Sequence, residues 1–142
     1  MKILFVDTNV LIDFLANRKP FSISAAKLFT LSLSNKVKLY ISAVSYNNIY
    51  YILRQSLSHK ETIRLLKELS ALTTIVDVSK KVIEAAIASD FNDFEDAIQF
   101  QCALSINKVD CIITRDIKVY KKSTIRVMST EEIISFIETL GV

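Results

Sequence analysis

Glycine is almost missing from this sequence, in which Gly141 is the only one among 142 residues. Dinucleotide-binding loops and P-loops need several glycines, because the backbone must approach a phosphate group closely at those positions. No segment of the sequence could form either loop. Nucleotide-cofactor enzymes of these two types are therefore excluded.

Histidine and cysteine are also scarce, with His59 the only histidine and Cys102 and Cys111 the only cysteines. Ser58 and Glu61 have the spacing of a capping box, which predicts a helix start at His59 and not a catalytic triad. The two cysteines fit neither a C-x-x-C motif nor a common zinc-ligand spacing. We expect them to be buried thiols in a reducing compartment.

Long apolar runs are missing too, since none reaches the roughly 18 residues that a membrane-spanning helix needs. The run KILFV at residues 2–6 is too short for the apolar region of a signal peptide, and no small-residue cleavage site follows it. Hydrophobic residues make up 51% of the chain and charged residues 23%, which is typical of a globular protein. We therefore expect one cytoplasmic domain spanning residues 1–142, without a membrane partner.

Apolar runs of strand length alternate with segments of helix length along the whole chain. Strands are expected at residues 2–6, 37–41, 73–78, 110–114 and 124–128. Helices are expected between them, from about Asn9 to a break near Pro20, and then opening at or near Ser22, Ser42, Ser58, Ser79, Asp93 and Ser129. This alternation predicts an α/β fold with three layers, α/β/α, around a central parallel sheet of about five strands.

Aspartates fall where a sheet of this kind binds ligands, outside the carboxyl ends of its strands. Asp7 ends the first strand, and Asp116 follows the buried strand CIIT. Asp96 lies in the first turn of the helix that Asp93 opens. Converging carboxylates repel by roughly 4 kcal/mol per pair at about 4 Å and an effective dielectric constant of about 20. A hard divalent cation such as Mg²⁺ relieves that repulsion, and it can activate water against a phosphodiester.

Each of these acids also has a purely structural explanation. Asp7 could cap the first helix, and Asp93 is expected to be an N-cap paired with Asp96 three residues later. Glu95 is expected to be a solvated acid in a first helical turn, where it favours the helix dipole. Asp13 is expected to be a solvated residue of the first helix. Spacing by itself leaves the structural and the functional explanations open.

The net charge of +3 says little about partners, but the charges are unevenly distributed. An acidic cluster and a basic cluster are present, as in an enzyme that holds a cation and grips a polyanion. Solvated surface is the alternative for both clusters. Their members are Asp90, Asp93, Glu95 and Asp96, and Arg115, Lys118, Lys121, Lys122 and Arg126.

Four segments taken together resemble the PIN-domain nucleases, the family that includes VapC-type toxins. FVDTNVLIDFL is similar to the opening motif of that family, and YISAVSYNNIYYILRQ to its second strand and helix. DFEDAIQFQCALSINKVDCIITRDIKVY resembles its central acidic helix, short buried strand and terminal acidic turn. IRVMSTEEIISFI resembles its last strand and helix. The resemblance covers nearly the whole chain and agrees with the predicted sheet.

The resemblance implies a ribonuclease that cleaves single-stranded RNA by metal-activated water, with Mg²⁺ or Mn²⁺ as cofactor. It also implies the toxin of a toxin–antitoxin pair, with an antitoxin as partner and a homodimer as assembly. The implied catalytic and metal-binding acids are Asp7, Asp96 and Asp116, and the implied pocket-shaping residues are Thr8, Asn9 and Thr114. We expect RNA phosphates to contact Arg115, Lys118, Lys121 and Lys122.

One position departs from the family pattern, because Asn48 stands where the family usually has a glutamate; Asn47 is the equivalent if the register slips. An asparagine oxygen can ligate a hard cation but adds no negative charge, so weaker metal binding is expected. The carboxylate of Asp93 could partly compensate for the missing glutamate. The purely structural explanation for Asn48 is a side-chain amide that hydrogen-bonds to neighbouring backbone. The alternative function is a weakened or inactive RNA-binding or regulatory module. A metal-dependent phosphatase is a third, weaker option, since its Asp-x-Asp motif is missing.

Overall fold

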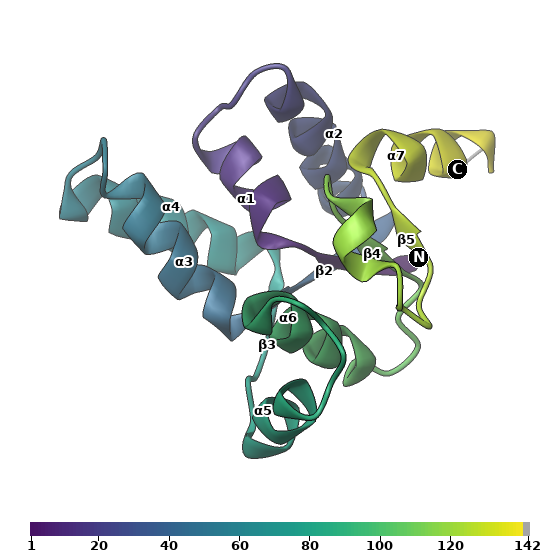
Figure 1. Ribbon diagram of the computed structural model, residues 1–142. Helices are drawn as coiled ribbons and strands as arrows, with labels where there is room; N and C mark the ends of the chain where they lie inside the picture. The colour runs from purple at the N-terminus through teal and green to yellow at the C-terminus, as the bar shows by residue number, and fades with distance from the viewer. Residues whose placement is uncertain (141–142) are drawn as a thin grey trace.

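The computed structural model describes residues 1–140, so the last two residues of the expected domain lie outside it. Its centre is a parallel five-stranded sheet in the order β3-β2-β1-β4-β5 (Figure 1). The strands are β1 (Lys2–Val6), β2 (Val37–Ser42), β3 (Thr74–Val76), β4 (Cys111–Ile113) and β5 (Val127–Met128). The predicted parallel sheet of about five strands is confirmed.

Helices connect the strands and cover both faces of the sheet (Figure 1). One apolar cluster joins the sheet to helices α1, α2, α3, α4 and α7, and the other joins it to α5, α6 and the short 3₁₀ helix η1. The helices are α1 (Thr8–Leu15), α2 (Phe21–Leu33), α3 (Ala43–Leu53), α4 (His59–Leu72), α5 (Lys80–Ile87), α6 (Phe94–Leu104), η1 (Ile117–Tyr120) and α7 (Thr130–Thr139). This is the predicted three-layer arrangement.

The central strand β1 shows why its sequence is an unbroken apolar run. Leu4, Phe5 and Val6 are fully buried, with Leu4 and Val6 in one apolar cluster and Phe5 in the other. A parallel strand covered on both faces offers no solvent-exposed position, so it does not alternate polar with apolar residues. This packing fixes the carboxyl end of β1, and therefore Asp7, in the middle of one edge of the sheet.

Serine caps begin several helices where the sequence predicts them. The Ser58 hydroxyl accepts a hydrogen bond from the Glu61 N–H, and Ser129 and Glu132 form a complete capping box. Both cysteines are free and buried, as expected. Among residues 1–140, no helix has the length and apolarity that a bilayer crossing requires.

Three local details differ from the sequence-based expectation. The helix predicted to open at Ser42, whose pattern runs through residue 57, ends at Leu53, where the N–H groups of Ser56 and Leu57 both donate to the Leu53 carbonyl. The last strand is only two residues long, and η1 was not predicted. None of these differences changes the sheet edge at which the aspartates lie.

Candidate active site

Asp7 continues the sheet and also caps the first helix, as its sequence position predicts. Its backbone N–H donates to the Ile113 carbonyl across the sheet at 2.9 Å. Its carboxylate is held at both oxygens, since Oδ1 accepts from the Thr8 N–H and Oδ2 from the Thr114 hydroxyl, each at 2.8 Å. Only 6% of the residue is exposed. Burial raises the pKa of Asp7, although the bonds from Thr114 and Thr8 lower it in part.

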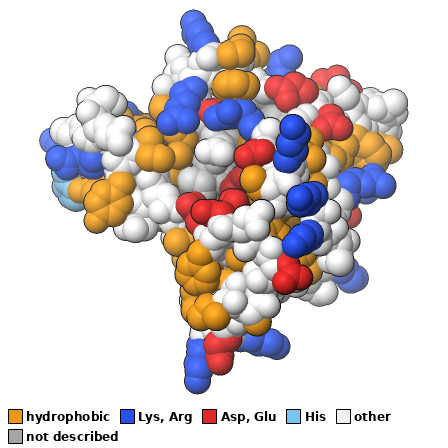
Figure 2. Space-filling view, in the orientation of Figure 1, with side chains coloured by type: hydrophobic (Ala, Val, Ile, Leu, Met, Phe, Trp, Pro, Cys, Tyr) orange, Lys and Arg blue, Asp and Glu red, His pale blue; other side chains and the backbone are white. Residues whose placement is uncertain are grey.

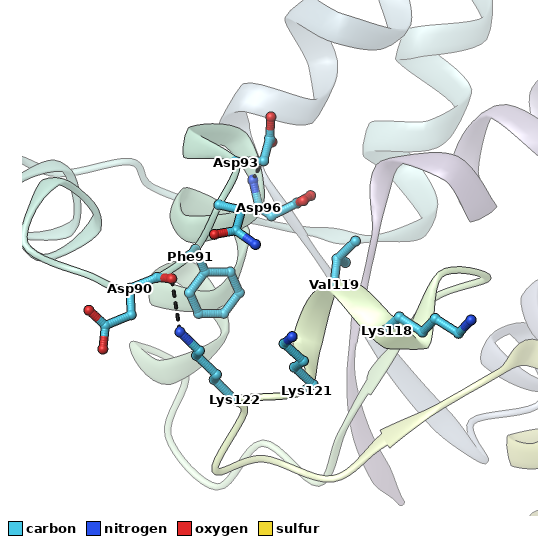
Figure 3. A pocket seen from close by; sticks show the side chains of 9 residues that line it. Asp90, Phe91, Asp93, Asp96, Lys118, Val119, Lys121 and Lys122 are labelled. Carbon is cyan, nitrogen blue, oxygen red and sulfur yellow. Dashed lines mark hydrogen bonds between the residues drawn. The ribbon is translucent and has the colours of Figure 1, made fainter.

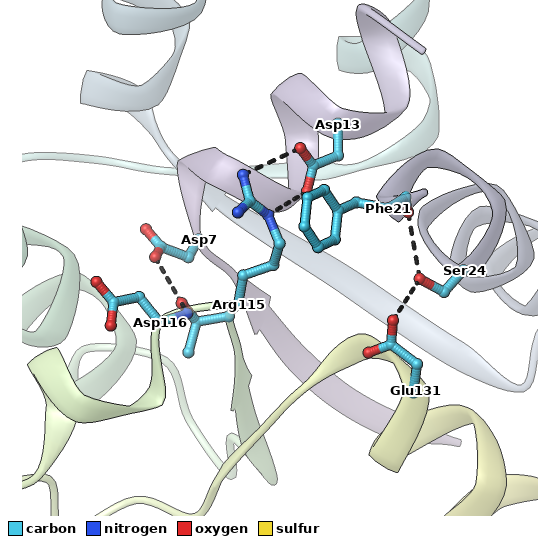
Figure 4. A network of polar contacts seen from close by, with 8 residues as sticks. Asp7, Asp13, Phe21, Ser24, Arg115, Asp116 and Glu131 are labelled. Atoms are coloured by element: carbon cyan, nitrogen blue, oxygen red, sulfur yellow. Dashed lines mark hydrogen bonds and ion pairs between the residues drawn. The ribbon is translucent and has the colours of Figure 1, made fainter. Parts of the chain in front are cut away.

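Thr114 connects Asp7 to Asp116. The Thr114 hydroxyl donates to Asp7 and accepts from the Asp116 N–H at 3.0 Å. In the view of Figure 4, the Asp7 and Asp116 side chains lie next to each other. The charge of Asp116 contributes to the raised pKa of Asp7. One buried hydroxyl therefore sets the positions of two acids that lie 109 residues apart in the sequence.

Asp96 joins these acids from the first turn of α6. Its backbone N–H donates to the Asp93 carboxylate at 3.1 Å, so Asp93 is the helix cap that its position predicts. Burial raises the pKa of Asp96 to about 6, with further contributions from the charges of Asp93, Asp7, Glu95 and Asp116. These carboxylates are thus near enough to repel one another.

Asp96 lies at the boundary of two recesses on this face. The first, with a cavity volume of about 320 Å³, is lined by acids and amides, including Asp7, Thr8, Asn9, Asn48, Glu95 and Asp96. The second, of about 280 Å³, is lined by lysines on one side and acids on the other, including Lys118, Lys121, Lys122, Asp90, Asp93 and Asp96. Figure 2 shows acidic side chains gathered in the central hollow, with basic side chains along one flank.

Glu95 is not the solvated acid that its sequence position predicts. It is half-buried, lines the first recess and accepts a hydrogen bond from the Asn48 side-chain amide at 2.5 Å. Burial raises the pKa of Glu95, and the charges of Asp7 and Asp93 raise it further. Asn47 is exposed, so Asn48 is the asparagine that enters the recess. Its amide pairs with a carboxylate instead of with backbone.

A buried polar network lies behind this recess. The Gln99 side-chain amide donates to the hydroxyls of Thr8 at 2.9 Å and Ser45 at 3.0 Å, and those two hydroxyls lie 2.7 Å apart. All three residues are buried, and they tie α1, α3 and α6 together. Sequence reasoning missed Gln99 and Ser45, although each lies one helical turn from a residue of the recess.

Tyr120 is a further residue that sequence reasoning missed. It is 1% exposed, and its hydroxyl forms no well-aligned hydrogen bond within residues 1–140. The hydroxyl is nevertheless near enough to Asp7 to help lower the pKa of that carboxyl. Burial raises the pKa of Tyr120 itself, and the charge of Asp7 adds to that rise. A buried donor beside Asp7 thus retains hydrogen-bonding capacity.

Arg115 is engaged within the protein. Its guanidinium donates to Asp13 from Nε at 2.6 Å and from a terminal nitrogen at 3.2 Å, and it lies 4.1 Å from the centre of the Phe21 ring (Figure 4). The expectation that Asp13 is solvated is wrong, because the residue is 1% exposed. Burial was not visible in the sequence, since the partner of Asp13 lies 102 residues away. The expected contact between Arg115 and RNA would compete with this bidentate pair.

The lysines of the second recess differ from Arg115. Lys118, Lys121 and Lys122 line the recess with Asp96, and Figure 3 shows Lys121 and Lys122 near Phe91, with the Lys118 side chain extending away from them. The Lys122 ammonium donates to the backbone carbonyl of Asp90 at 3.1 Å. Within residues 1–140, no ion pair joins these lysines to a carboxylate. Their positive charges therefore remain available to a polyanion.

The donor chemistry of the site fits a hard divalent cation. Within the described residues, no lysine or arginine forms an ion pair with any acid of the recess, and the Tyr120 hydroxyl beside Asp7 is unsatisfied. In the same residues, no group of three or more acid, histidine or cysteine side chains is drawn together closely enough to hold an ion as it stands. Cation binding would therefore require these side chains to adjust toward one another.

Known proteins resemble this chain in sequence and in fold. A sequence profile described as PIN domain matches residues 3–118. Ribonuclease VapC1 of Aquifex aeolicus (strain VF5) is 28% identical over 135 residues, covering 91% of each chain. A toxin–antitoxin complex from Klebsiella pneumoniae has a TM-score of 0.67 and 21% identity, covering 89% of this chain and 97% of that one.

VapC20 of Mycobacterium tuberculosis, described as a sarcin-ricin loop cleaving toxin, is also similar in structure. Its TM-score is 0.64 at 16% identity, over 83% of this chain and 95% of that chain. At these identities the structural likeness establishes the fold alone. The profile match covers most of the sequence and also includes the segments that carry Asp7, Asp96 and Asp116. The chain belongs to the PIN domain family.

Proposed function

We propose that this protein is a metal-dependent endoribonuclease that cleaves single-stranded RNA. The observation that carries the proposal is that Asp7, Asp96 and Asp116 lie at one edge of the sheet, near enough for the charges of Asp7 and Asp116 to act on Asp96. They come from three distant segments, their charges raise the pKa of Asp96, and no basic side chain in the described residues neutralises them. The similarity to a protein named Ribonuclease VapC1 supports the choice of substrate.

The three aspartates are proposed to hold Mg²⁺ or Mn²⁺, which when bound supplies positive charge for the phosphodiester and lowers the pKa of water. The Thr114 hydroxyl holds the Asp7 carboxylate and the backbone N–H of Asp116 next to each other. The Asp93 cap fixes the start of the helix that carries Asp96. These contacts fix the backbone from which Asp96 and Asp116 extend and the carboxylate of Asp7, so the adjustment that remains on cation binding is one of side chains.

The second recess is proposed to receive the RNA backbone. Lys118, Lys121 and Lys122 place positive charge next to Asp96, and phosphate contacts of this kind position a nucleic acid without reading its sequence. Thr8 and Asn9 shape the opposite wall of the site at the start of α1. The RNA would then run from the lysine-lined recess past Asp96 to the acidic one.

The biological setting proposed is the toxin of a toxin–antitoxin pair, acting in the cytoplasm as a homodimer with an antitoxin as partner. The similarity to a toxin–antitoxin complex from Klebsiella pneumoniae supports the antitoxin. The dimer and the cytoplasmic location follow from the family resemblance. A single domain spanning residues 1–142 is part of the same proposal.

A second candidate function is an RNA-binding module that no longer cleaves. Asn48 favours it, because this amide stands in the recess where the family resemblance leads one to expect a carboxylate. The two candidates differ in whether RNA is cut or only bound.

The test is cleavage of a mixed single-stranded RNA with Mn²⁺, Mg²⁺ or EDTA, for the wild type, Asp7→Asn and Asp77→Asn. Asp77 is a matched control, since it is an exposed aspartate that lines neither recess. We expect cutting by the wild type and by Asp77→Asn only when metal is present, and none by Asp7→Asn. Cutting that survives both EDTA and Asp7→Asn refutes the proposal, and metal-independent binding without cutting favours the module.

A further inference from the structure

We infer that Glu95 is a fourth carboxylate of the cation site and that Asn48 is the residue that positions it. This inference rests on the proposed function, because it assigns a role within the same metal site. It gives Asn48 the role of a hydrogen-bond donor to Glu95, in place of the role of a neutral metal ligand.

The placement of Glu95 is the first argument. Glu95 lines the same recess as Asp7 and Asp96, and it does so from the helix turn that also carries Asp96. It is half-buried, and within residues 1–140 no lysine or arginine forms an ion pair with it. A carboxylate that only serves the helix dipole would gain most by facing water. Glu95 instead adds negative charge to the place where the aspartates already gather.

The hydrogen bond from Asn48 is the second argument. The Asn48 amide nitrogen donates to Glu95 Oε1 at 2.5 Å from a different helix, α3, so the amide directs the carboxylate into the recess. A neutral donor holds a carboxylate without cancelling its charge, whereas a lysine or arginine would compete with a cation. The contact therefore orients the Glu95 carboxylate without pairing it with a positive charge.

The buried network behind the recess makes this orientation rigid. Ser45 lies one turn before Asn48 on α3, and Gln99 lies one turn after Glu95 on α6. Gln99 donates to Ser45 at 3.0 Å, so the two helices are joined by two polar contacts one turn apart. Buried hydrogen bonds of this kind favour one arrangement of the side chains, although the Gln99 Oε1 atom accepts no hydrogen bond within residues 1–140. Glu95 thus has the support expected of a ligand that must be in place before the ion binds.

The test measures Mn²⁺ affinity by isothermal titration calorimetry on metal-free protein at constant pH. Glu95→Gln removes the charge but keeps an oxygen that can accept from Asn48. We expect it to weaken Mn²⁺ binding by about tenfold or more. The double variant Asn48→Glu with Glu95→Gln returns a carboxylate to the recess from the opposite helix, and should recover most of the loss. Glu84→Gln, at an exposed position of α5, is the matched control and should bind as the wild type does.

A structural role for the pair predicts a different pattern. If Glu95 only links α3 to α6, Glu95→Gln leaves Mn²⁺ affinity unchanged, which overturns the inference while Asp7→Asn still abolishes binding. Should Glu95→Gln not fold, Asn48→Ala retains the charge and removes its donor, and unchanged affinity there also overturns the inference. Absence of Mn²⁺ binding by the wild type would overturn both this inference and the proposed function.

Discussion

Replacing Asp96 by asparagine should make the metal-free protein more stable at neutral pH while removing its activity. Asp96 is held among Asp7, Glu95, Asp93 and Asp116, and burial together with these charges raises its pKa from 3.8 to about 6. Among residues 1–140, the Asp96 side chain has no hydrogen bond or ion pair that asparagine would lose, since the bond to Asp93 comes from the backbone N–H. The substitution therefore removes repulsion without removing a partner.

The magnitude follows from the pKa. A rise of about 2 in pKa corresponds to about 3 kcal/mol of cost for the ionised form in the folded state. Asp96 is only partly buried, so solvent screening reduces this to about 1 kcal/mol. The substitution also removes a negative charge that is favourable near the helix N-terminus, which reduces the expected gain in stability by about 0.3 kcal/mol. The expected net gain in the free energy of unfolding is therefore between about 0.5 and 1 kcal/mol at pH 7.5.

The direction in which the stability of the wild type changes with pH tests the electrostatic explanation. Between the unfolded value near 3.8 and the folded value of about 6, the folded state binds more protons than the unfolded state. Stability of the wild type therefore falls as the pH rises through this window, and the fall ends above the folded pKa. The asparagine variant lacks this contribution, so its advantage should be near zero at low pH and reach its full value above pH 6 or so.

The assay is urea denaturation of the wild type, Asp96→Asn and the control Asp77→Asn, in EDTA, at several pH values across the window. A stability gain that grows with pH in Asp96→Asn and not in Asp77→Asn supports the electrostatic reasoning. A loss of stability in Asp96→Asn that is the same at all pH values would refute it, because the residue would then matter for packing and not for charge.

Three further outcomes are expected. Thr114→Val should lower the free energy of unfolding by about 1–3 kcal/mol, because Asp7 loses a buried donor, and urea denaturation measures this loss. Asp13→Ala should destabilise by about 2 kcal/mol in the same assay, because Arg115 loses its bidentate partner in a partly buried place. Lys121→Ala should weaken binding of single-stranded RNA and reduce the salt dependence of log K by about 0.7, measured by titration at several salt concentrations.

The threonine and lysine variants each have a matched control. Thr124→Val removes an exposed hydroxyl and should leave stability unchanged, so an equal loss in both threonine variants would contradict the role given to Thr114. If log K for RNA binding depends on salt concentration equally in Lys121→Ala and the wild type, RNA does not contact the second recess through Lys121. Lys80→Ala removes an exposed lysine that lines neither recess and should not change the slope.

The order of elements and the edge that carries the aspartates could be predicted because both depend on local patterns. A strand buried on both faces must be apolar throughout, as KILFV is, and alternation with helices makes the sheet parallel. Parallel strands end at one common edge, so Asp7 and Asp116 had to lie near each other once their strands were neighbours. Helix starts were equally local, as the caps at Ser58 and Ser129 show.

The polar partners could not be predicted, because they come from elements far apart in the chain. Spacing gives the face on which a residue lies, but not which side chain of another element meets it. Glu95 has the sequence position of a solvated first-turn acid, yet Asn48, 47 residues away, draws it into the recess.

The sequence by itself therefore determined the α/β/α architecture, the parallel sheet and the edge at which Asp7 and Asp116 follow their strands, since these depend on hydrophobic periodicity. Only the tertiary structure decided that Asp13 is buried against Arg115, that Thr114 bridges two acids and that Glu95 faces the recess. Burial and pairing of charged groups depend on what packs around them in space, and that environment is assembled only when distant elements meet.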